Sequence, residues 1–325
     1  MQLGATEGKS VREPNLTILP RPVERQSRQG ADRSRGRSAR RLAVLTFREL
    51  DDPGSFRAQV ERLLRTASPV SLTQVQDALA GGLPLPPHAV LLTFEHGHRS
   101  AATTALPVLA ARRVPAVAFV VAGLVGSERP YWWDEARLLI EEGGYSRRLP
   151  GREPAGAVAA MAALPDPDRR SCLEELRVTA RRTVPGRAQL TADDLRALRD
   201  GGIVIGNHSL GHARLDRCDD YVVREEVVGG HRILTELLGE EPSAFAHPHG
   251  VADGRAEALL RGYGYRSAFL GDDQLFDLRA VGAVRPDPLR ISRLGVDSGT
   301  SRGIFDSVLA GWTPGLRRLR GAVAV

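Results

Sequence analysis

Six of the eight histidines in the chain fall in three pairs, and each pair directly follows a short apolar run. The pairs are His96 with His98, His208 with His212, and His247 with His249. Imidazole is the commonest metal ligand in proteins, and a His-x-x-x-His pair can present both rings on one side of a turn. Glu95 stands beside the first pair and supplies a carboxylate that could move a proton. These residue types and spacings indicate a metal site with an adjacent acid–base group.

Buried strands are the elements that must position these side chains. The apolar runs 89–94, 203–205 and 244–247 have the length and composition of short buried strands. In a parallel sheet or barrel the carboxyl ends of the strands share one face, so the residues that follow them converge. One pair alone is more often a capped strand end with solvated polar residues. Three pairs at three strand ends favour a metal site over coincidence.

The fold class follows from the alternation of predicted strands with helical segments. The predicted strands are residues 42–47, 89–94, 116–121, 203–205, 244–247, 267–270 and 290–296. This alternation predicts a parallel sheet with helices outside it, in a closed or nearly closed α/β barrel or a doubly wound sheet.

The distribution of charge divides the chain near residue 40. Residues 1–41 hold ten Lys or Arg and four Asp or Glu, which accounts for the whole formal net charge of +6. Low hydrophobicity without periodicity predicts a disordered Arg-rich tail over 1–40 and a folded domain over 41–325. Nucleic acid is not a favoured partner, because no aromatic side chains interleave the arginines to stack on bases. Residues 146–188, rich in Arg, Pro and Ala, are expected to form a helical insertion.

The segments that direct a chain into or across a membrane are not recognised in this sequence, so we expect a cytoplasmic protein. No apolar stretch approaches the roughly 18 residues of a membrane span. The early positive charge is not followed by the apolar segment of a secretory signal. Cys172 and Cys218 lie far apart without metal-ligand spacing, so we expect free thiols in a reducing compartment. The oligomeric state is left open.

The order of the motifs resembles the polysaccharide deacetylase (NodB-homology) family. The resemblance is carried by Thr93–Gly97, His208–His212 and Phe245–Gly250, and it runs from about Leu42 to Val296. It implies a distorted (β/α) barrel of about seven strands. It also implies metal-dependent removal of an acetyl or formyl group from an amide nitrogen, commonly on an amino sugar.

The first motif departs from the family pattern of two consecutive aspartates, a general base followed by a metal ligand. Glu95 and His96 stand at those positions, so the resemblance implies His96, His208 and His212 as ligands. Three histidines suit Zn²⁺ or another divalent transition metal and leave one coordination position open. Glu95 remains a carboxylate base but is one methylene longer, and an ångström of displacement can cost on the order of a hundredfold in rate.

The resemblance also implies roles for the later motifs. His249 stands where a backbone N–H helps to hold the oxyanion, and Arg293 lies in a segment that carries a pocket arginine in one branch of the family. The family's late general-acid histidine is absent, which leaves His98, His247, His249 or Glu95 itself to protonate the leaving group. The expected substrate contacts are His98, His247, Pro248 and Trp133.

Two functions therefore stay open. The first is a metal-dependent amide hydrolase that removes an acetyl or formyl group from an amino sugar or a related N-acylated small molecule. The second is a catalytically impaired relative that acts as a carbohydrate-binding or regulatory module.

Overall fold

The computed structural model describes residues 41–149, 153–279, 285–297 and 299–309. The predicted tail, residues 1–40, lies outside the described residues, so its disorder stays a prediction. None of the helices in the described ranges combines the length and the hydropathy needed to cross a membrane.

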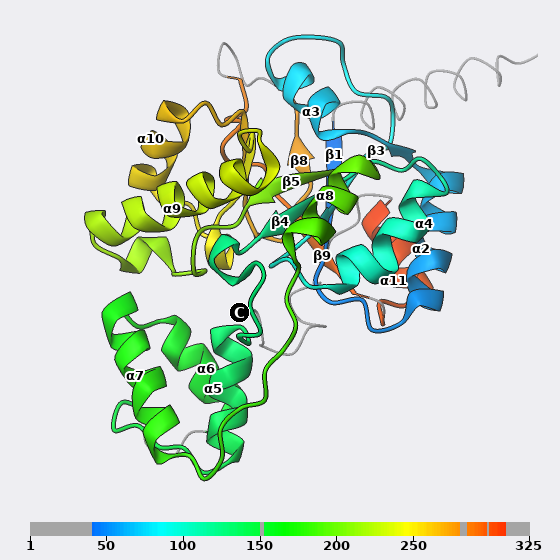
Figure 1. Ribbon diagram of the computed structural model, residues 1–325. Coiled ribbons are helices and arrows are strands. Elements are labelled where there is room, and N and C mark those ends of the chain that lie inside the picture. Colours follow the sequence, from blue (N-terminus) through cyan, green and yellow to red (C-terminus); the bar gives the residue numbers. More distant parts are fainter. Residues whose placement is uncertain (1–40, 150–152, 280–284, 298, 310–325) are drawn as a thin grey trace, which may run out of the picture.

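A curled, mostly parallel sheet forms the centre of the fold (Figure 1). Its neighbouring parallel strands, in order, are β1 (Arg41–Phe47), β3 (Ala89–Phe94), β4 (Ala116–Val120), β5 (Ile203–Asn207), β6 (Ala244–Ala246) and β7 (Ser267–Phe269). Two short strands lie at its margins: β2 (Ser68–Pro69) runs parallel to β3, and β8 (Phe276–Asp277) runs antiparallel to β1. The strands are nearly continuous apolar runs because helices and the barrel interior bury both of their faces.

The two edges of this sheet meet through one segment late in the chain. Ile291 pairs with Phe269 of β7, and three residues later β9 (Leu294–Val296) pairs in parallel with β1. The segment 291–296 therefore joins the first strand to the last. This closure confirms the expected distorted (β/α) barrel of about seven strands and distinguishes it from an open doubly wound sheet.

Helices cover the outside of the barrel (Figure 1). They are α2 (Pro53–Thr66), α3 (Leu72–Leu79), α4 (Leu106–Ala110), α8 (Ala192–Asp200), α9 (Asp220–Leu238), α10 (Gly254–Gly262) and α11 (Arg302–Leu309). Helix α2 shows how the sequence sets them: Phe56, Val60 and Leu63 recur at helical spacing and are buried. Asp52 is the N-cap of α2, because its carboxylate accepts hydrogen bonds from the N–H groups of Gly54 and Ser55.

Three further helices form a lobe beside the barrel (Figure 1). The helical lobe comprises α5 (Trp132–Glu141), α6 (Pro154–Ala162) and α7 (Asp166–Thr179), packed around a small apolar core of their own. Residues 146–188, expected as a helical insertion, contain α6 and α7. The lobe begins earlier than the composition of that segment indicated, because α5 packs against both of the other helices.

Candidate active site

The residues that follow β3, β5 and β6 lie at one end of the barrel. Each strand is extended by one residue through a backbone hydrogen bond: Glu95 N–H to Phe47 O (2.8 Å), His208 N–H to Val120 O (2.9 Å), and His247 N–H to Phe269 O (3.0 Å). Parallel pairing therefore brings the three predicted motifs together, as the strand pattern predicted.

His96, His208 and His212 form a buried cluster in which one possible ligand atom from each residue lies within 4.8 Å of the others. The ring centroids are 5.4 Å apart for His96 and His208, 4.9 Å for His96 and His212, and 4.6 Å for His208 and His212. We call these three residues the histidine cluster. They are the three residues that the family resemblance implied as metal ligands.

The protonation of the histidine cluster suits a metal ion. Nδ1 of His208 lies 2.9 Å from the carbonyl oxygen of Ala246, which places the proton there and leaves the Nε2 lone pair free. Nε2 of His208, Nδ1 of His96 and both ring nitrogens of His212 are buried without a hydrogen-bond partner. Burial lowers the pKa of His208 to about 4 and the pKa values of His96 and His212 well below their usual range, so all three are neutral at pH 7. Buried, neutral imidazoles with free lone pairs fit a divalent transition metal.

Glu95 lies beside the histidine cluster and is paired with a buried arginine. Nη2 of Arg293 lies 2.6 Å from Oε1 of Glu95, and that oxygen is 4.0 Å from Nε2 of His208. Burial alone would raise the pKa of the Glu95 carboxyl, but the charges of Arg293 and Arg48, joined by that of His208 once it is protonated below about pH 4, hold it at about 2. Glu95 is therefore ionised at neutral pH and lies next to the candidate metal position.

Arg293 is itself fixed on three sides. Its side chain is almost completely buried, and besides Glu95 it donates from Nε to the carbonyl oxygen of Leu270 (2.6 Å) and from Nη1 to the hydroxyl of Thr46 (3.5 Å). These bonds connect Glu95, which follows β3, to β1 and to the segment after β7. The arginine therefore sets the position of the Glu95 carboxylate.

Aromatic side chains from the start of the helical lobe cover the cluster. The ring of Trp133 lies 4.7 Å from that of His96 and 4.9 Å from that of His212. Tyr131 stacks on Trp133 at 4.8 Å, and His98 lies 4.7 Å from Tyr131. The structure thus places Trp133 against the candidate metal position, and His98 contacts both Tyr131 and His96, with its ring 5.7 Å from that of His96.

The third motif forms another wall of the site. His249 packs on His212 at 4.8 Å and has a left-handed backbone (φ 57°). His247 and Pro248 are buried, and Nε2 of His247 lies 3.3 Å from the carbonyl oxygen of Leu289. Of these two histidines, His249 contacts the histidine cluster, while His247 is tied through Nε2 to the chain before β9.

A residue that the motifs did not identify holds the second motif in place. Ser209 (φ 66°) and His212 (φ 58°) both adopt left-handed backbones, which strain residues other than glycine. Oε2 of Glu226, on α9, accepts hydrogen bonds from the Ser209 hydroxyl (2.7 Å), the Gly211 N–H (2.8 Å) and the Ala213 N–H (3.4 Å). The Ser209 hydroxyl oxygen in turn accepts from the His212 N–H (3.0 Å). The only signal in the sequence is that Glu226 falls on the buried face of α9 with Val223 and Val227.

If the histidine cluster holds a metal ion, we predict that Glu226→Ala weakens its binding, measured with Zn²⁺, by about 10- to 100-fold, the usual effect of losing a group that orients metal ligands. The reason is that the loop of residues 209–213 loses the hydrogen-bond acceptor that stabilises its strained backbone. Competition with a chromogenic chelator measures the dissociation constant. Glu226→Gln, which keeps an oxygen acceptor, should lose less. Glu225→Ala, at an exposed position on the same helix, is the control. Unchanged zinc affinity in Glu226→Ala would contradict this role.

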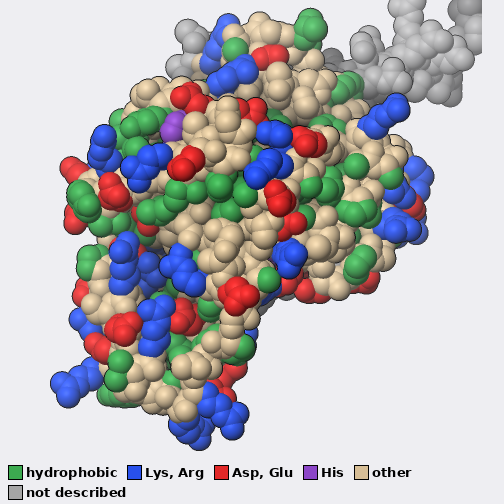
Figure 2. Space-filling view, viewed as in Figure 1, with side chains coloured by type: hydrophobic (Ala, Val, Ile, Leu, Met, Phe, Trp, Pro, Cys, Tyr) green, Lys and Arg blue, Asp and Glu red, His purple; other side chains and the backbone are tan. Residues whose placement is uncertain are grey.

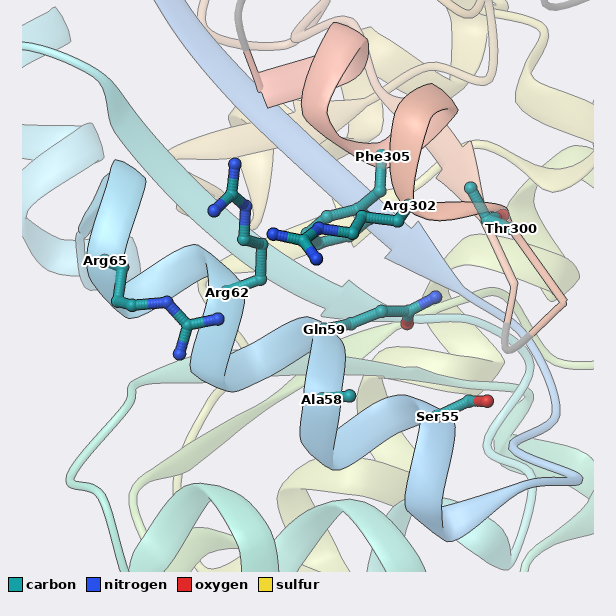
Figure 3. Close-up of a pocket in the computed structure, with 8 residues that line it drawn as sticks. All are labelled: Ser55, Ala58, Gln59, Arg62, Arg65, Thr300, Arg302 and Phe305. Atoms are coloured by element: carbon teal, nitrogen blue, oxygen red, sulfur yellow. The ribbon is translucent and has the colours of Figure 1, made fainter.

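A separate cavity of about 280 Å³ lies on the outside of the barrel, between α2 and α11 (Figure 3). Three arginines, Arg62, Arg65 and Arg302, extend along it in Figure 3, and Oδ1 of Asp306 accepts from Nε of Arg62 at 2.7 Å. None of its eight lining residues is a histidine, a cysteine or a carboxylate. This cavity therefore lacks the groups for acid–base or metal chemistry, and the barrel end is the candidate active site.

The chain is similar in sequence to known deacetylases. The sequence pattern of the family described as polysaccharide deacetylase matches residues 83–147 and 170–268, about half of the chain. Over 49 residues the chain is 49% identical to the poly-β-1,6-N-acetyl-D-glucosamine N-deacetylase of Escherichia coli K12. That alignment covers 15% of this chain and only 7% of the length of the curated relative.

Solved structures of deacetylases share the fold. The Streptococcus pyogenes deacetylase PplD, in complex with acetate, aligns with a TM-score of 0.57 at 15% identity, over 83% of this chain and 98% of its own. IcaB from Ammonifex degensii aligns with a TM-score of 0.54 at 21% identity, over 84% of this chain and 97% of its own. The deacetylase domain of BpsB from Bordetella bronchiseptica aligns with a TM-score of 0.51 at 19% identity, over 80% of this chain and 97% of its own. At these identities the likeness shows the architecture, a curled parallel sheet with surrounding helices.

Proposed function

Because the chain belongs to the polysaccharide deacetylase family of amide hydrolases, we propose that it removes acetyl groups from an amino-sugar polysaccharide with a metal ion held by His96, His208 and His212. The observation that supports this most is the meeting of three neutral imidazoles, each with a ring nitrogen that has no hydrogen-bond partner, with an ionised carboxylate at one end of the barrel. We propose Zn²⁺ as the metal, since a site of nitrogen ligands without a carboxylate favours zinc over cations that prefer oxygen.

The chain's own residues have separable tasks in this proposal. A divalent metal at the histidine cluster would supply Lewis acidity, which polarises an amide carbonyl and acidifies water. Glu95, ionised and 4.0 Å from His208, accepts the proton of the attacking water and returns it to the departing amine. Arg293 fixes the Glu95 carboxylate. The backbone N–H of His249, on the turn beside His212, helps to hold the oxyanion.

The substrate that we propose to test first is a β-linked polymer of N-acetylglucosamine. Its support is the similarity over 49 residues to an enzyme that acts on poly-β-1,6-N-acetyl-D-glucosamine. A small or lipid-linked N-acylated amino sugar is the second candidate substrate. This candidate goes with our proposal that the protein is cytoplasmic. Cell fractionation followed by immunoblotting tests that location.

The experiment for the main proposal is release of acetate from β-1,6-linked N-acetylglucosamine oligomers by the zinc-loaded protein. Release that stops on treatment with a chelator and returns with zinc supports the proposal. The altered first motif, Glu95 and His96, favours the alternative of an impaired carbohydrate-binding module. Oligomer binding without bound zinc and without acetate release would establish that alternative.

The three proposed metal ligands lead to a separate prediction. If His96 is a ligand, His96→Ala should lower the zinc bound per chain at least as much as His212→Ala does, because each removes one of three nitrogen donors. Atomic absorption on dialysed protein measures this content. His88→Asn is the control, since His88 is exposed and asparagine tolerates its left-handed backbone (φ 56°). Unchanged zinc in His96→Ala would instead indicate a two-histidine site completed by Glu95, with no carboxylate left as base.

A further inference from the structure

A cavity of about 200 Å³ lies at the junction of the helical lobe and the barrel. His212 forms part of its wall on the barrel side, and α7 contributes to the opposite wall. The cavity therefore adjoins the histidine cluster but draws part of its lining from the lobe. Figure 2 shows acidic and basic side chains side by side where the lobe meets the barrel, so this face carries no patch of a single charge.

The lining of this cavity is amphipathic. Leu124, Leu173 and Leu210 give it an apolar wall, and the indoles of Trp132 and Trp133 add flat surfaces. Trp133 also touches His96 and His212. A ligand ring stacked on Trp133 in the cavity would therefore be separated from the candidate metal position by that one side chain. Apolar and aromatic walls with a few fixed polar groups are the usual lining of a small-ligand site.

One fixed polar group on the lobe faces this cavity. Nε and Nη2 of Arg177 lie 2.7 Å and 2.8 Å from the two carboxylate oxygens of Glu135, and Nη1 lies 3.1 Å from Glu174. A guanidinium has five N–H groups, so two remain free to donate to a ligand. Arg129 also lines the cavity, so these two arginines and the two carboxylates Glu135 and Glu174 cancel in charge, which favours neutral hydroxyl acceptors over an anion.

We propose that this cavity is a saccharide subsite, in which the helical lobe binds the uncharged pyranose ring next to the residue that loses its acetyl group. A pyranose combines an apolar ring face with hydroxyls at its edge, which matches the leucine and indole walls and the fixed guanidinium. Arg177 and Leu124 then determine preference for chain length without taking part in the reaction. The identity of the ligand as an N-acetylated oligosaccharide rests on the proposed function.

Binding measured apart from turnover tests the subsite. Isothermal titration calorimetry, with Glu95→Gln as the background, compares the tetramer of β-1,6-linked N-acetylglucosamine with the monomer. Arg177→Ala removes the fixed donors, and Leu124→Trp fills the cavity from a half-buried position. Each should weaken tetramer binding on the order of tenfold: Arg177→Ala loses a hydrogen bond from a charged group, and Leu124→Trp occupies the space of the sugar ring. Monomer binding and zinc content should stay unchanged.

Matched controls lie on the same lobe. Arg137→Ala removes an exposed, ion-paired arginine of α5, and Val178→Trp adds an indole at a position of α7 that is 77% exposed. Both should bind the tetramer as the parent does. If Arg177→Ala and any folded Leu124→Trp bind the tetramer with wild-type affinity, the subsite proposal is wrong. It is also wrong if monomer and tetramer binding fall equally, because the acetylated residue itself would then occupy the cavity. Acetate release by the wild type is scored separately, so failure of the proposed function can be told from failure of the subsite.

Discussion

Replacing Glu95 by glutamine is expected to lower acetate release on the order of 10²- to 10⁴-fold, the usual contribution of a general base, with bound zinc unchanged. Glutamine keeps the shape of the side chain and can still accept a hydrogen bond from Arg293, but it has no useful affinity for a proton. Initial rates of acetate release at saturating zinc, together with atomic absorption, measure the two quantities.

The control for this experiment is Glu225→Gln, an exposed carboxylate on α9 that should leave both quantities unchanged. Full activity in Glu95→Gln would mean that another group is the base, with His98 the next candidate because it lies in the same aromatic wall. Loss of zinc together with activity would instead make Glu95 a ligand.

Replacing Arg293 by methionine is expected to lower the free energy of unfolding by about 3–5 kcal/mol, because it leaves Glu95 as a buried charge without its partner. Urea denaturation measures the change. Arg137→Met, which breaks an exposed ion pair with Glu141, should cost less than about 1 kcal/mol. The double variant Arg293→Met with Glu95→Gln should recover much of the loss, since no uncompensated carboxylate then remains.

The same pair predicts a dependence on pH. The pKa of Glu95 is about 2 in the folded protein against an ordinary value of 4.5, so the ionised form is favoured by folding. The stability difference between wild type and Glu95→Gln should therefore be fully present above about pH 4.5 and should shrink as the pH falls toward 2. A difference that does not vary with pH, or a single variant Arg293→Met as stable as wild type, would show that the ion pair contributes nothing to the fold.

Much of the barrel could be predicted because its signals are local. Apolar runs such as 89–94 and 116–120 have the length and composition of buried strands, and their alternation with helices restricts the topology to a few parallel arrangements. The closure of the barrel was harder to foresee. It depends on Ile291 and β9 pairing with strands at opposite edges of the sheet, and β9 is only three residues long.

The residues of the candidate active site likewise include some that could be predicted from the sequence and some that could not. The three histidine pairs and Glu95 could be found from the sequence because each directly follows a strand, and parallel strands end on one face. Glu226 could not, since its role depends on α9 passing beside the loop that it caps. Nor could the pair of Arg177 and Glu135, which lie 42 residues apart in sequence on α7 and α5.

The sequence by itself identified the candidate residues for chemistry and the strand ends that hold them, because strand periodicity and motif order are properties of neighbouring residues. Only the tertiary structure decided that Arg293 pairs with Glu95 across 198 residues, that Glu226 supports the second motif, and that the helical lobe adds a wall beside His212. These arrangements depend on side chains from distant elements meeting in space. Hydrogen bonding and burial then favour one packing, and no pattern of nearby residues encodes it.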